Sequence, residues 1–433
     1  MKRGEERVEM DGKKIVLFGK RSLLLMQMAI LCCLLGCGSV SRDALQAPPQ
    51  MTESESPKVE SAASPAESQM TERELLESEM AQICEDIYLR AAEEGRLSDP
   101  QVIHSIVSWY GEHGYVAVDS RNQVDMTGAQ QAMRFCEAAE AGEDVSLTVI
   151  RVGGRGETAV YDLNVESGQM EIVRSRYEYR NGFMQRTDSI SYQAEDWKYT
   201  PEGYLMFCGK WFSEQTYVLM LSGAEEYTAL RIWPLDGKCR KMNEEYIFPV
   251  GYEHNNMFLT DWSEDDFGEL NFYDLYDKFY PRVNGRPVPY RTADDLNEGA
   301  VYDIPQESFE FVLQSYLRID SETLREKTVY IPQERVYEYR PRGFYEAESS
   351  HPYPEVTAYR ENGDSTITLT VHAVYPKAGL SRAHTHEVTV RPGENGSVQY
   401  VSNRVLPSEE GGETRWHTPR LTQAQWKAVY GER

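Results

Sequence analysis

The sequence lacks the short motifs that mark the common hydrolases and metalloproteases. Neither Gly-x-Ser-x-Gly nor His-Glu-x-x-His occurs, and no cysteine and histidine form a known catalytic signature. Histidine itself is scarce, with 8 among 433 residues. We therefore assign no catalytic residue, no cofactor and no metal ion from the sequence, and a non-enzymatic role is favoured.

Basic residues are also in short supply. Lys and Arg number 45 against 70 Asp and Glu, which gives a net charge of −25. Nucleic-acid binding requires a basic surface, so we expect no nucleic-acid partner. Such an acidic surface would also be repelled by anionic lipid or wall polymer, unless cations bridge the two.

A hydrophobic run long enough to span a bilayer is missing as well. The apolar stretch Leu23 to Leu35 has about 13 residues, whereas a membrane-spanning helix needs roughly 20. Basic residues precede this stretch, as in a secretory signal peptide. The stretch runs into Leu34-Leu35-Gly36-Cys37, which resembles the bacterial lipobox.

The lipobox resemblance implies a lipoprotein signal peptide over residues 1–36 and lipid attachment at Cys37. In lipobox proteins the thiol of this cysteine is joined to a diacylglycerol. Acyl chains such as palmitate then hold the protein at the cell membrane, facing the extracytoplasmic side. The alternatives are an ordinary secretory signal and an uncleaved anchor. Residues 1–36 hold seven Lys/Arg and four Asp/Glu, so their removal would change the net charge from −25 to −28.

Residues 37–70 are predicted to be a disordered tether. The segment is rich in Ser, Pro, Glu, Gln and Ala and cannot bury enough apolar surface to offset the entropy lost on ordering. Four cysteines follow it, and we favour buried thiols over two disulfides for them, since a free Cys acts as a small hydrophobe. These cysteines are Cys84, Cys136, Cys208 and Cys239.

The remaining chain predicts an α+β fold with two domains, 71–262 and 263–433, each made of helices followed by an antiparallel β-meander. The first domain opens with a capping box at Thr71 and helices to Gly95, from Asp99, and over 127–141. Alternating hydrophobicity and turn pairs then predict strands near 145–152, 158–165, 170–179, 183–193, 203–212, 216–221, 227–233 and 244–250. Asp236-Gly237 is one of the expected hairpin turns.

The second domain is expected to begin with a helical stretch from Ser263 and a loop over 280–302. An amphipathic helix follows Pro305, a short one follows Asp320, and strands continue to Leu406. A second capping box at Thr422 opens a C-terminal helix. The repeated order suggests two similarly built halves, although no residue-level repeat is visible.

Turn residues predict the register of the C-terminal sheet. A two-residue turn at Asn362-Gly363 would pair Ala358 with Ile367, and the next loop would pair Tyr375 with Arg382. Further expected pairs are Leu369 with Val388, Ile367 with Val390, and Val390 with Val401. The apolar rows then line up across four strands, and the helix after Pro305 is the expected cover.

This register tests the most suggestive residues in the chain, His384 and His386, which have the spacing of metal ligands on one strand. His372 would point to the opposite face of the sheet, and His386 would lie between Val371 and Val405. We therefore interpret His386 as a hydrogen-bonded core residue, while a two-His site completed by distant residues remains the alternative.

Two other motifs are rejected on their context. The run Gly154 to Ala159 has the spacing of a dinucleotide-binding loop but joins two strands and opens no helix. Asp261, Ser263 and Asp265 begin like a calcium loop, but the turn glycine and closing glutamate are replaced, so a helix cap is the better interpretation.

The lipobox-like run, the acidic tether and the helix-then-meander body together resemble uncharacterised lipoproteins of Gram-positive anaerobes, a group without an assigned activity. The run from His386 to Pro392, then Gln399 to Asn403, looks like the end of that group's C-terminal domain. A helix on a curved sheet over about 300–406 also resembles cystatin-like or NTF2-like domains. The anchor, the tether and two α+β domains without a catalytic constellation favour a surface lipoprotein that binds an envelope protein or a cell-wall ligand. The alternatives are an envelope glycan hydrolase, suggested by the aromatic and carboxylate content, and a transporter solute-binding subunit.

Overall fold

The computed structural model describes residues 72–211, 227–290, 299–342, 351–407 and 416–431. The chain divides into two units, Met1–Ser68 and Gln69–Arg433, and all described residues belong to the second. The predicted signal peptide, Cys37, the tether and the capping residue Thr71 lie outside the described part. The fold is α+β, as the sequence predicts.

Three helical segments form the N-terminal part of the unit. Helix α2 (Glu72–Ile83) continues through a π-helical turn (Cys84–Tyr88) into α3 (Leu89–Glu93), and α4 spans Pro100–Glu112. Asp99 caps α4, since its carboxylate accepts a hydrogen bond from the Gln101 N–H. The continuous helical segment of α2 and α3, and helix α4, lie where the periodicity predicts helices.

A five-stranded sheet follows, with the strand order β1-β2-β3-β4-β5. Its strands are β1 (Val116–Asp119), β2 (Val145–Val152), β3 (Glu157–Glu166), β4 (Gln169–Arg180) and β5 (Phe183–Gln193), and α5 (Ala129–Glu140) links the first two. Ser167-Gly168 and Asn181-Gly182, two of the turn pairs from which these strands are predicted, form the hairpin turns from β3 to β4 and from β4 to β5. Strand β1 was not expected and pairs parallel to β2. All four of its residues are buried, so it shows no alternation of polar and apolar residues.

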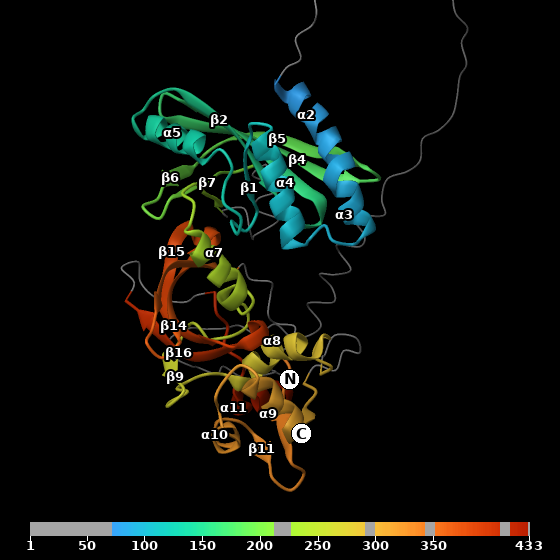
Figure 1. Cartoon of the computed structure of the whole chain (residues 1–433), viewed down its shortest axis with the longest axis vertical. Coiled ribbons are helices and arrows are strands. Elements are labelled where there is room, and N and C mark those ends of the chain that lie inside the picture. Colours follow the sequence, from blue (N-terminus) through green and yellow to red (C-terminus); the bar gives the residue numbers. More distant parts are fainter. Residues whose placement is uncertain (1–71, 212–226, 291–298, 343–350, 408–415, 432–433) are drawn as a thin grey trace, which may run out of the picture. The chain divides into compact units, whose positions relative to one another are not determined.

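This sheet is covered on both faces. Apolar side chains of α2 and α4 pack against one face, which carries Ile150 and Val160. On the other face, α5 and the sheet β6-β7-β8 pack against residues such as Val149 and Leu163. The small sheet consists of β6 (Asp196–Tyr199), β7 (Tyr204–Cys208) and β8 (Thr228–Arg231). Figure 1 shows α2, α3 and α4 together along the β1–β5 sheet.

The strand predicted at 244–250 is wrong. The segment is helical, with α7 at Gly237–Met242 and a π-helical turn at Asn243–Ile247. Asp236 is a helix cap rather than a hairpin residue, because its carboxylate accepts hydrogen bonds from the backbone N–H groups of Lys238 and Cys239. The strand predicted at 216–221 lies outside the described residues.

The helix expected from Ser263 begins later than predicted. Helix α8 spans Phe272–Asn284, capped by Asn271, and so occupies part of the segment expected to be a loop. Ser263 instead belongs to the short strand β9 (Trp262–Ser263) and accepts hydrogen bonds from the N–H groups of Asp265 and Asp266 in a turn. The side-chain cap predicted here therefore closes a turn rather than a helix.

The C-terminal sheet has the strand order β13-β14-β15-β16-β9. Its longer strands are β13 (Tyr353–Glu361), β14 (Ile367–Tyr375), β15 (Leu380–Pro392) and β16 (Val398–Leu406). The predicted pairs of Leu369 with Val388 and Ile367 with Val390 are confirmed. His386 lies between Val371 and Val405, again as predicted.

Three predicted pairs at the ends of these strands are wrong. Ile367 pairs with Glu361 rather than Ala358, because the Asn362 N–H and side chain bond to Thr366 and close a longer loop. Tyr375 pairs with Leu380 rather than Arg382, after an irregularity in the ladder. A β-bulge next to Val390 places Tyr400, not Val401, opposite it.

Helices cover the apolar face of the C-terminal sheet. Phe309 and Val312 of α9 (Gln306–Gln314) and Phe279 of α8 share one core with Leu369 and Val388. The expected cover by the helix after Pro305 is thereby confirmed. The remaining elements are α10 (Ser321–Lys327), β10 (Tyr302–Pro305), β11 (Tyr330–Ile331), β12 (Val336–Tyr339) and α11 (Gln423–Tyr430), whose capping box at Thr422 is present. This core extends from Cys239 to Tyr400, and the division at residue 262 stays a prediction.

Candidate functional site

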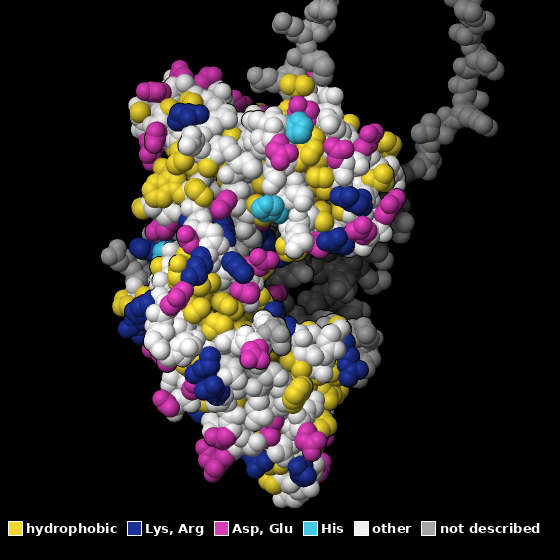
Figure 2. Space-filling model, viewed as in Figure 1, with side chains coloured by type: hydrophobic (Ala, Val, Ile, Leu, Met, Phe, Trp, Pro, Cys, Tyr) yellow, Lys and Arg dark blue, Asp and Glu magenta, His cyan; other side chains and the backbone are white. Residues whose placement is uncertain are grey.

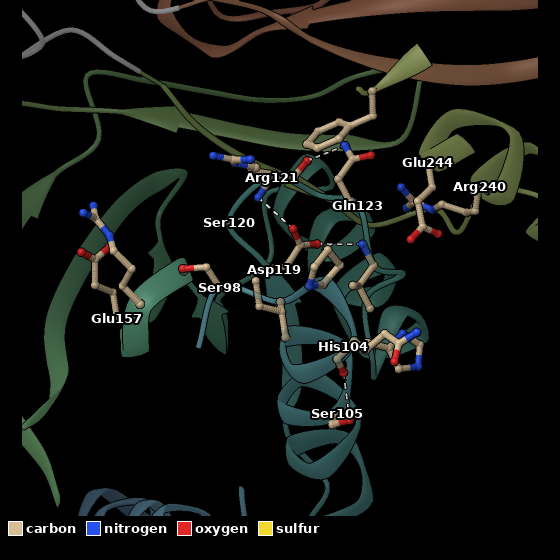
Figure 3. Close-up of a pocket in the computed structure, with 17 residues that line it drawn as sticks. Ser98, His104, Ser105, Asp119, Ser120, Arg121, Gln123, Glu157, Arg240 and Glu244 are labelled. Carbon is tan, nitrogen blue, oxygen red and sulfur yellow. Dashed lines mark hydrogen bonds between the residues drawn. The ribbon is translucent and has the colours of Figure 1, made fainter. Parts of the chain in front are cut away.

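A cavity of about 740 Å³ opens at the N-terminal end of α4. Four segments line it: residues 98–105 of α4 and its approach, residues 119–124 after β1, the β2–β3 connection at 154–157, and Arg240, Glu244 and Phe248. Figure 3 shows the polar side chains of these segments around the opening. Because the segments are distant in sequence, only the tertiary fold brings their side chains together.

Asp119 shapes the wall that follows β1. Its carboxylate accepts hydrogen bonds from the backbone N–H groups of Arg121, at 3.0 Å, and Val124, at 2.8 Å. The side chain is buried, and burial raises the pKa of Asp119 while these hydrogen bonds oppose the shift. Its carboxylate is therefore occupied in holding the loop, as the dashed lines in Figure 3 indicate.

Arg240 and Asn243 hold the opposite side of the same loop. The Arg240 guanidinium donates to Asp125 Oδ1 at 2.7 and 2.9 Å and to the Asn122 carbonyl oxygen. Asn243 Nδ2 donates to Gln123 Oε1 at 2.7 Å. These contacts neutralise Arg240 and fix the loop, so the Arg240 guanidinium is not free for a ligand.

Four other charged side chains of the cavity lack such partners. Within the described part of the chain, the side chains of Arg155, Glu157 and Glu244 form no hydrogen bond or ion pair, and Arg121 contacts only the Phe248 ring, at 5.8 Å. Figure 3 places Glu157 and Glu244 on opposite sides of the cavity with Asp119 between them. The free charges are thus two positive and two negative.

Arg155 has an unusual backbone. It adopts φ 60° and ψ 23°, a left-handed conformation, in the short 3-10 turn that joins β2 to β3. Residues with a Cβ pay about 1 kcal/mol or more for this conformation, and such outliers concentrate at functional sites. The turn confirms that the run from Gly154 joins two strands and opens no helix. Its arginine nevertheless reaches the cavity, which the rejected fingerprint did not suggest.

A buried polar network lies behind the loop that forms the cavity wall. Asn122 Nδ2 donates to Tyr353 Oη at 2.8 Å, and Tyr353 Oη donates to Tyr204 Oη at 3.2 Å. Tyr204 Oη and Arg231 Nη1 both donate to the Glu355 carboxylate, the latter at 2.8 Å. Burial raises the pKa of Glu355, and the positive charge of Arg231 opposes this shift. The network joins the cavity wall to β7, β8 and β13.

The histidines singled out in the sequence lie elsewhere. His386 is buried, with Nδ1 2.7 Å from Asn403 Oδ1 and Nε2 3.0 Å from Tyr252 Oη, and His384 Nε2 is 3.0 Å from the Phe258 carbonyl oxygen. Burial lowers the pKa of His386 to about 3. Both rings are hydrogen-bonded within the core, which confirms the structural interpretation of His386.

His372 does not join that pair. It is half-buried, and burial lowers its pKa to about 4, with a further contribution from Arg382. Across the described ranges, no group of three His, Cys, Asp or Glu side chains could hold a metal ion. The four cysteines Cys84, Cys136, Cys208 and Cys239 are free thiols, as favoured from the sequence.

Comparison with known proteins gives a family but no activity. Residues 70–420 match a family of unknown function, DUF6070. The chain belongs to this family. No curated protein and no solved structure shows a significant match to this chain. Among the helices of the described residues, none is long and apolar enough to cross a membrane. Membership in DUF6070 therefore leaves the molecular activity to be argued from the site.

Little in the amino-acid sequence indicates this site. Its free charges are spread over residues 121–244, and no motif links them. One signal was present: Gly153-Gly154-Arg155-Gly156 is a turn in which a long charged side chain stands among glycines. Such a placement indicates a side chain held out from a tight turn, although it does not identify what that side chain meets.

Proposed function

We propose that this DUF6070 protein is a lipid-anchored extracytoplasmic binding protein whose ligand occupies the α4 cavity. The observation that carries the proposal is the contrast between two sets of charged groups in that cavity. Asp119 and Arg240 are bound within the protein, whereas Arg121, Arg155, Glu157 and Glu244 have no polar partner among the described residues. Unpaired charged groups converging on a cavity are typical of ligand sites.

Binding fits this geometry better than catalysis. Hydrolysis of a glycan uses two carboxyl groups about 5–10 Å apart across the scissile bond. Here Glu157 and Glu244 lie on opposite sides of the cavity, and the Asp119 carboxylate between them is held by backbone N–H groups. Among the described residues that line the cavity there is no Tyr or Trp on which a sugar could stack.

The anchor is supported by the Leu34-Leu35-Gly36-Cys37 lipobox and by the basic and apolar segments before it. We expect Cys37→Ala to abolish labelling by an alkyne fatty acid in cells and to shift the protein from the membrane fraction to the soluble fraction. Cys33→Ala, four residues away, is the matched control and should keep both properties. Undiminished labelling of the Cys37→Ala protein would refute lipid attachment at this position.

The cavity is tested by filling it. Gln101 is exposed at the start of α4 and lines the cavity, so Gln101→Trp should block it, while Gln130→Trp on α5 makes the same change at an exposed helix position away from the cavity. Mass spectrometry would identify small molecules that co-purify with the full chain. We expect them with the wild type and Gln130→Trp and not with Gln101→Trp. Equal profiles for all three proteins would overturn the assignment of the cavity.

A further inference from the structure

We infer that the α4 cavity binds a short peptide through its free amino and carboxyl ends. The inference rests on the proposed function, because it names the class of ligand for the same site. Its basis is the pairing of two free positive groups, Arg121 and Arg155, with two free negative groups, Glu157 and Glu244, in one cavity.

The arginines supply the anion-binding half. A guanidinium offers a planar set of N–H donors that fits a carboxylate with two parallel hydrogen bonds. Neither Arg121 nor Arg155 has a carboxylate within ion-pair distance in the described residues, and Arg121 is positioned over the Phe248 ring. The N-terminus of α4 contributes less, since Asp99 already caps it.

The glutamates supply the cation-binding half. Glu157 and Glu244 lie on opposite sides of the cavity, as Figure 3 shows, so an ammonium group bound at one of them leaves the other side of the cavity open to an anionic group. A ligand with only a negative charge would bring Glu157 or Glu244 into a less hydrated site without a counter-charge. A ligand with only a positive charge would do the same to the arginines. Because desolvation of an unpaired charge is unfavourable, a zwitterion is favoured.

The cavity size and its neutral polar groups favour a peptide over a single amino acid. A volume of about 740 Å³ lies in the upper part of the range for small-molecule sites, roughly 300–1,000 Å³. A residue of extended chain adds about 3.3–3.6 Å, so a few residues separate the terminal charges enough to reach different walls. Ser98, Ser105 and Gln101 also line the cavity and can hydrogen-bond the peptide groups.

The test uses tetra-alanine and a pool of tetrapeptides in which one alanine is replaced by each other residue. Each is prepared with free ends, N-acetylated, or C-amidated, and binding to the purified full chain is measured by equilibrium dialysis with mass-spectrometric detection. We expect retention of peptides with both ends free and at least tenfold weaker binding when either end is blocked. Equal retention of free, acetylated and amidated peptides would overturn the inference.

Charge-removing variants assign the two ends. The variant Arg121→Gln/Arg155→Gln should weaken binding of the free peptide at least tenfold but change binding of the amidated peptide little, because that peptide has no terminal carboxylate. The variant Glu157→Gln/Glu244→Gln should also weaken binding of the free peptide at least tenfold. It should change binding of the acetylated peptide little, because that peptide has no terminal ammonium group. All four side chains are exposed or lack internal partners, so unfolding transitions should stay at their wild-type positions. Equal losses for every peptide form would refute recognition of the ends.

The outcomes separate this inference from the proposed function. If no peptide is retained while the co-purifying molecules still depend on the Gln101 position, peptide recognition fails and the binding cavity stands. If peptides are retained equally by wild type and Gln101→Trp, both the peptide inference and the cavity assignment fail. Retention of free peptides that Gln101→Trp abolishes supports both.

Discussion

The buried pair of Glu355 and Arg231 offers a sharp test of how this protein is held together. Glu355 is 1% exposed and Arg231 is 6% exposed, so almost no water reaches either charge. We consider Glu355→Ala, which removes the acceptor of two hydrogen bonds and leaves the Arg231 guanidinium without its counter-charge. Tyr204 Oη, also buried, loses its acceptor in the same change.

The expected loss is large. Removing one member of a buried ion pair typically costs about 3–5 kcal/mol, because the remaining charge stays desolvated. Glu355→Gln keeps an oxygen acceptor and should cost less than Glu355→Ala. Replacing both groups with apolar side chains, as in Arg231→Met/Glu355→Leu, removes the unpaired charge, so this double variant should be more stable than Glu355→Ala.

Urea denaturation followed by tryptophan fluorescence measures these free energies of unfolding. The control is Glu387→Ala, which breaks a pair with Arg404 whose side chain is 66% exposed, and it should cost no more than about 1 kcal/mol. A cost below about 1 kcal/mol for Glu355→Ala would refute the argument. So would a double variant less stable than Glu355→Ala.

Three further predictions concern the core and the cavity wall. The folded pKa of His386 is about 3 and the unfolded value is 6.5, so the unfolded state binds more protons between them. His386 should therefore make stability fall by roughly 1.4 kcal/mol per pH unit as the pH drops below about 6.5. In urea titrations run from pH 7 to 5, His386→Gln should reduce the slope by that amount and leave the contribution of His372, whose folded pKa is about 4. Phe309 of α9 is buried in the core, so Phe309→Ala should lower the free energy of unfolding by about 3–5 kcal/mol. Phe311 on the same helix is 62% exposed, so Phe311→Ala should change it by less than about 0.5 kcal/mol. Equal midpoints of the two variants in thermal melts would contradict this. Asp119→Ala leaves two backbone N–H groups without acceptors, so it should lower the free energy of unfolding by about 1–3 kcal/mol and abolish ligand retention. Unchanged hydrogen exchange at residues 121–124 would argue against this.

Local rules predicted most helices and strands. Caps at Asp99, Asp320 and Thr422 placed helix starts correctly, because the capping bond is made within three residues of the cap. Alternating apolar residues placed the centre of the C-terminal sheet. One error arose at Asp236, because Asp before Gly fits both a hairpin turn and a helix cap, and the structure has the cap. Another arose at Asn362, because the loop there is longer than its turn residues suggested.

The cavity could not be predicted in the same way. Arg121, Arg155, Glu157 and Glu244 come from three segments, and their proximity depends on the parallel placement of β1 beside β2 and on a helix where a strand was expected. Whether each charge is free depends on its neighbours. Arg240 is neutralised by Asp125, 115 residues away in the sequence, and no local pattern encodes that contact.

By itself, the sequence determined the α+β class, the core face of the C-terminal sheet and the buried setting of His386, because periodicity and turn residues act over a few positions. It also contains the run Leu34-Leu35-Gly36-Cys37, whose resemblance to a lipobox predicts the anchor at Cys37. Only the tertiary structure decided which charges remain free around α4, because that depends on contacts between segments far apart in the chain.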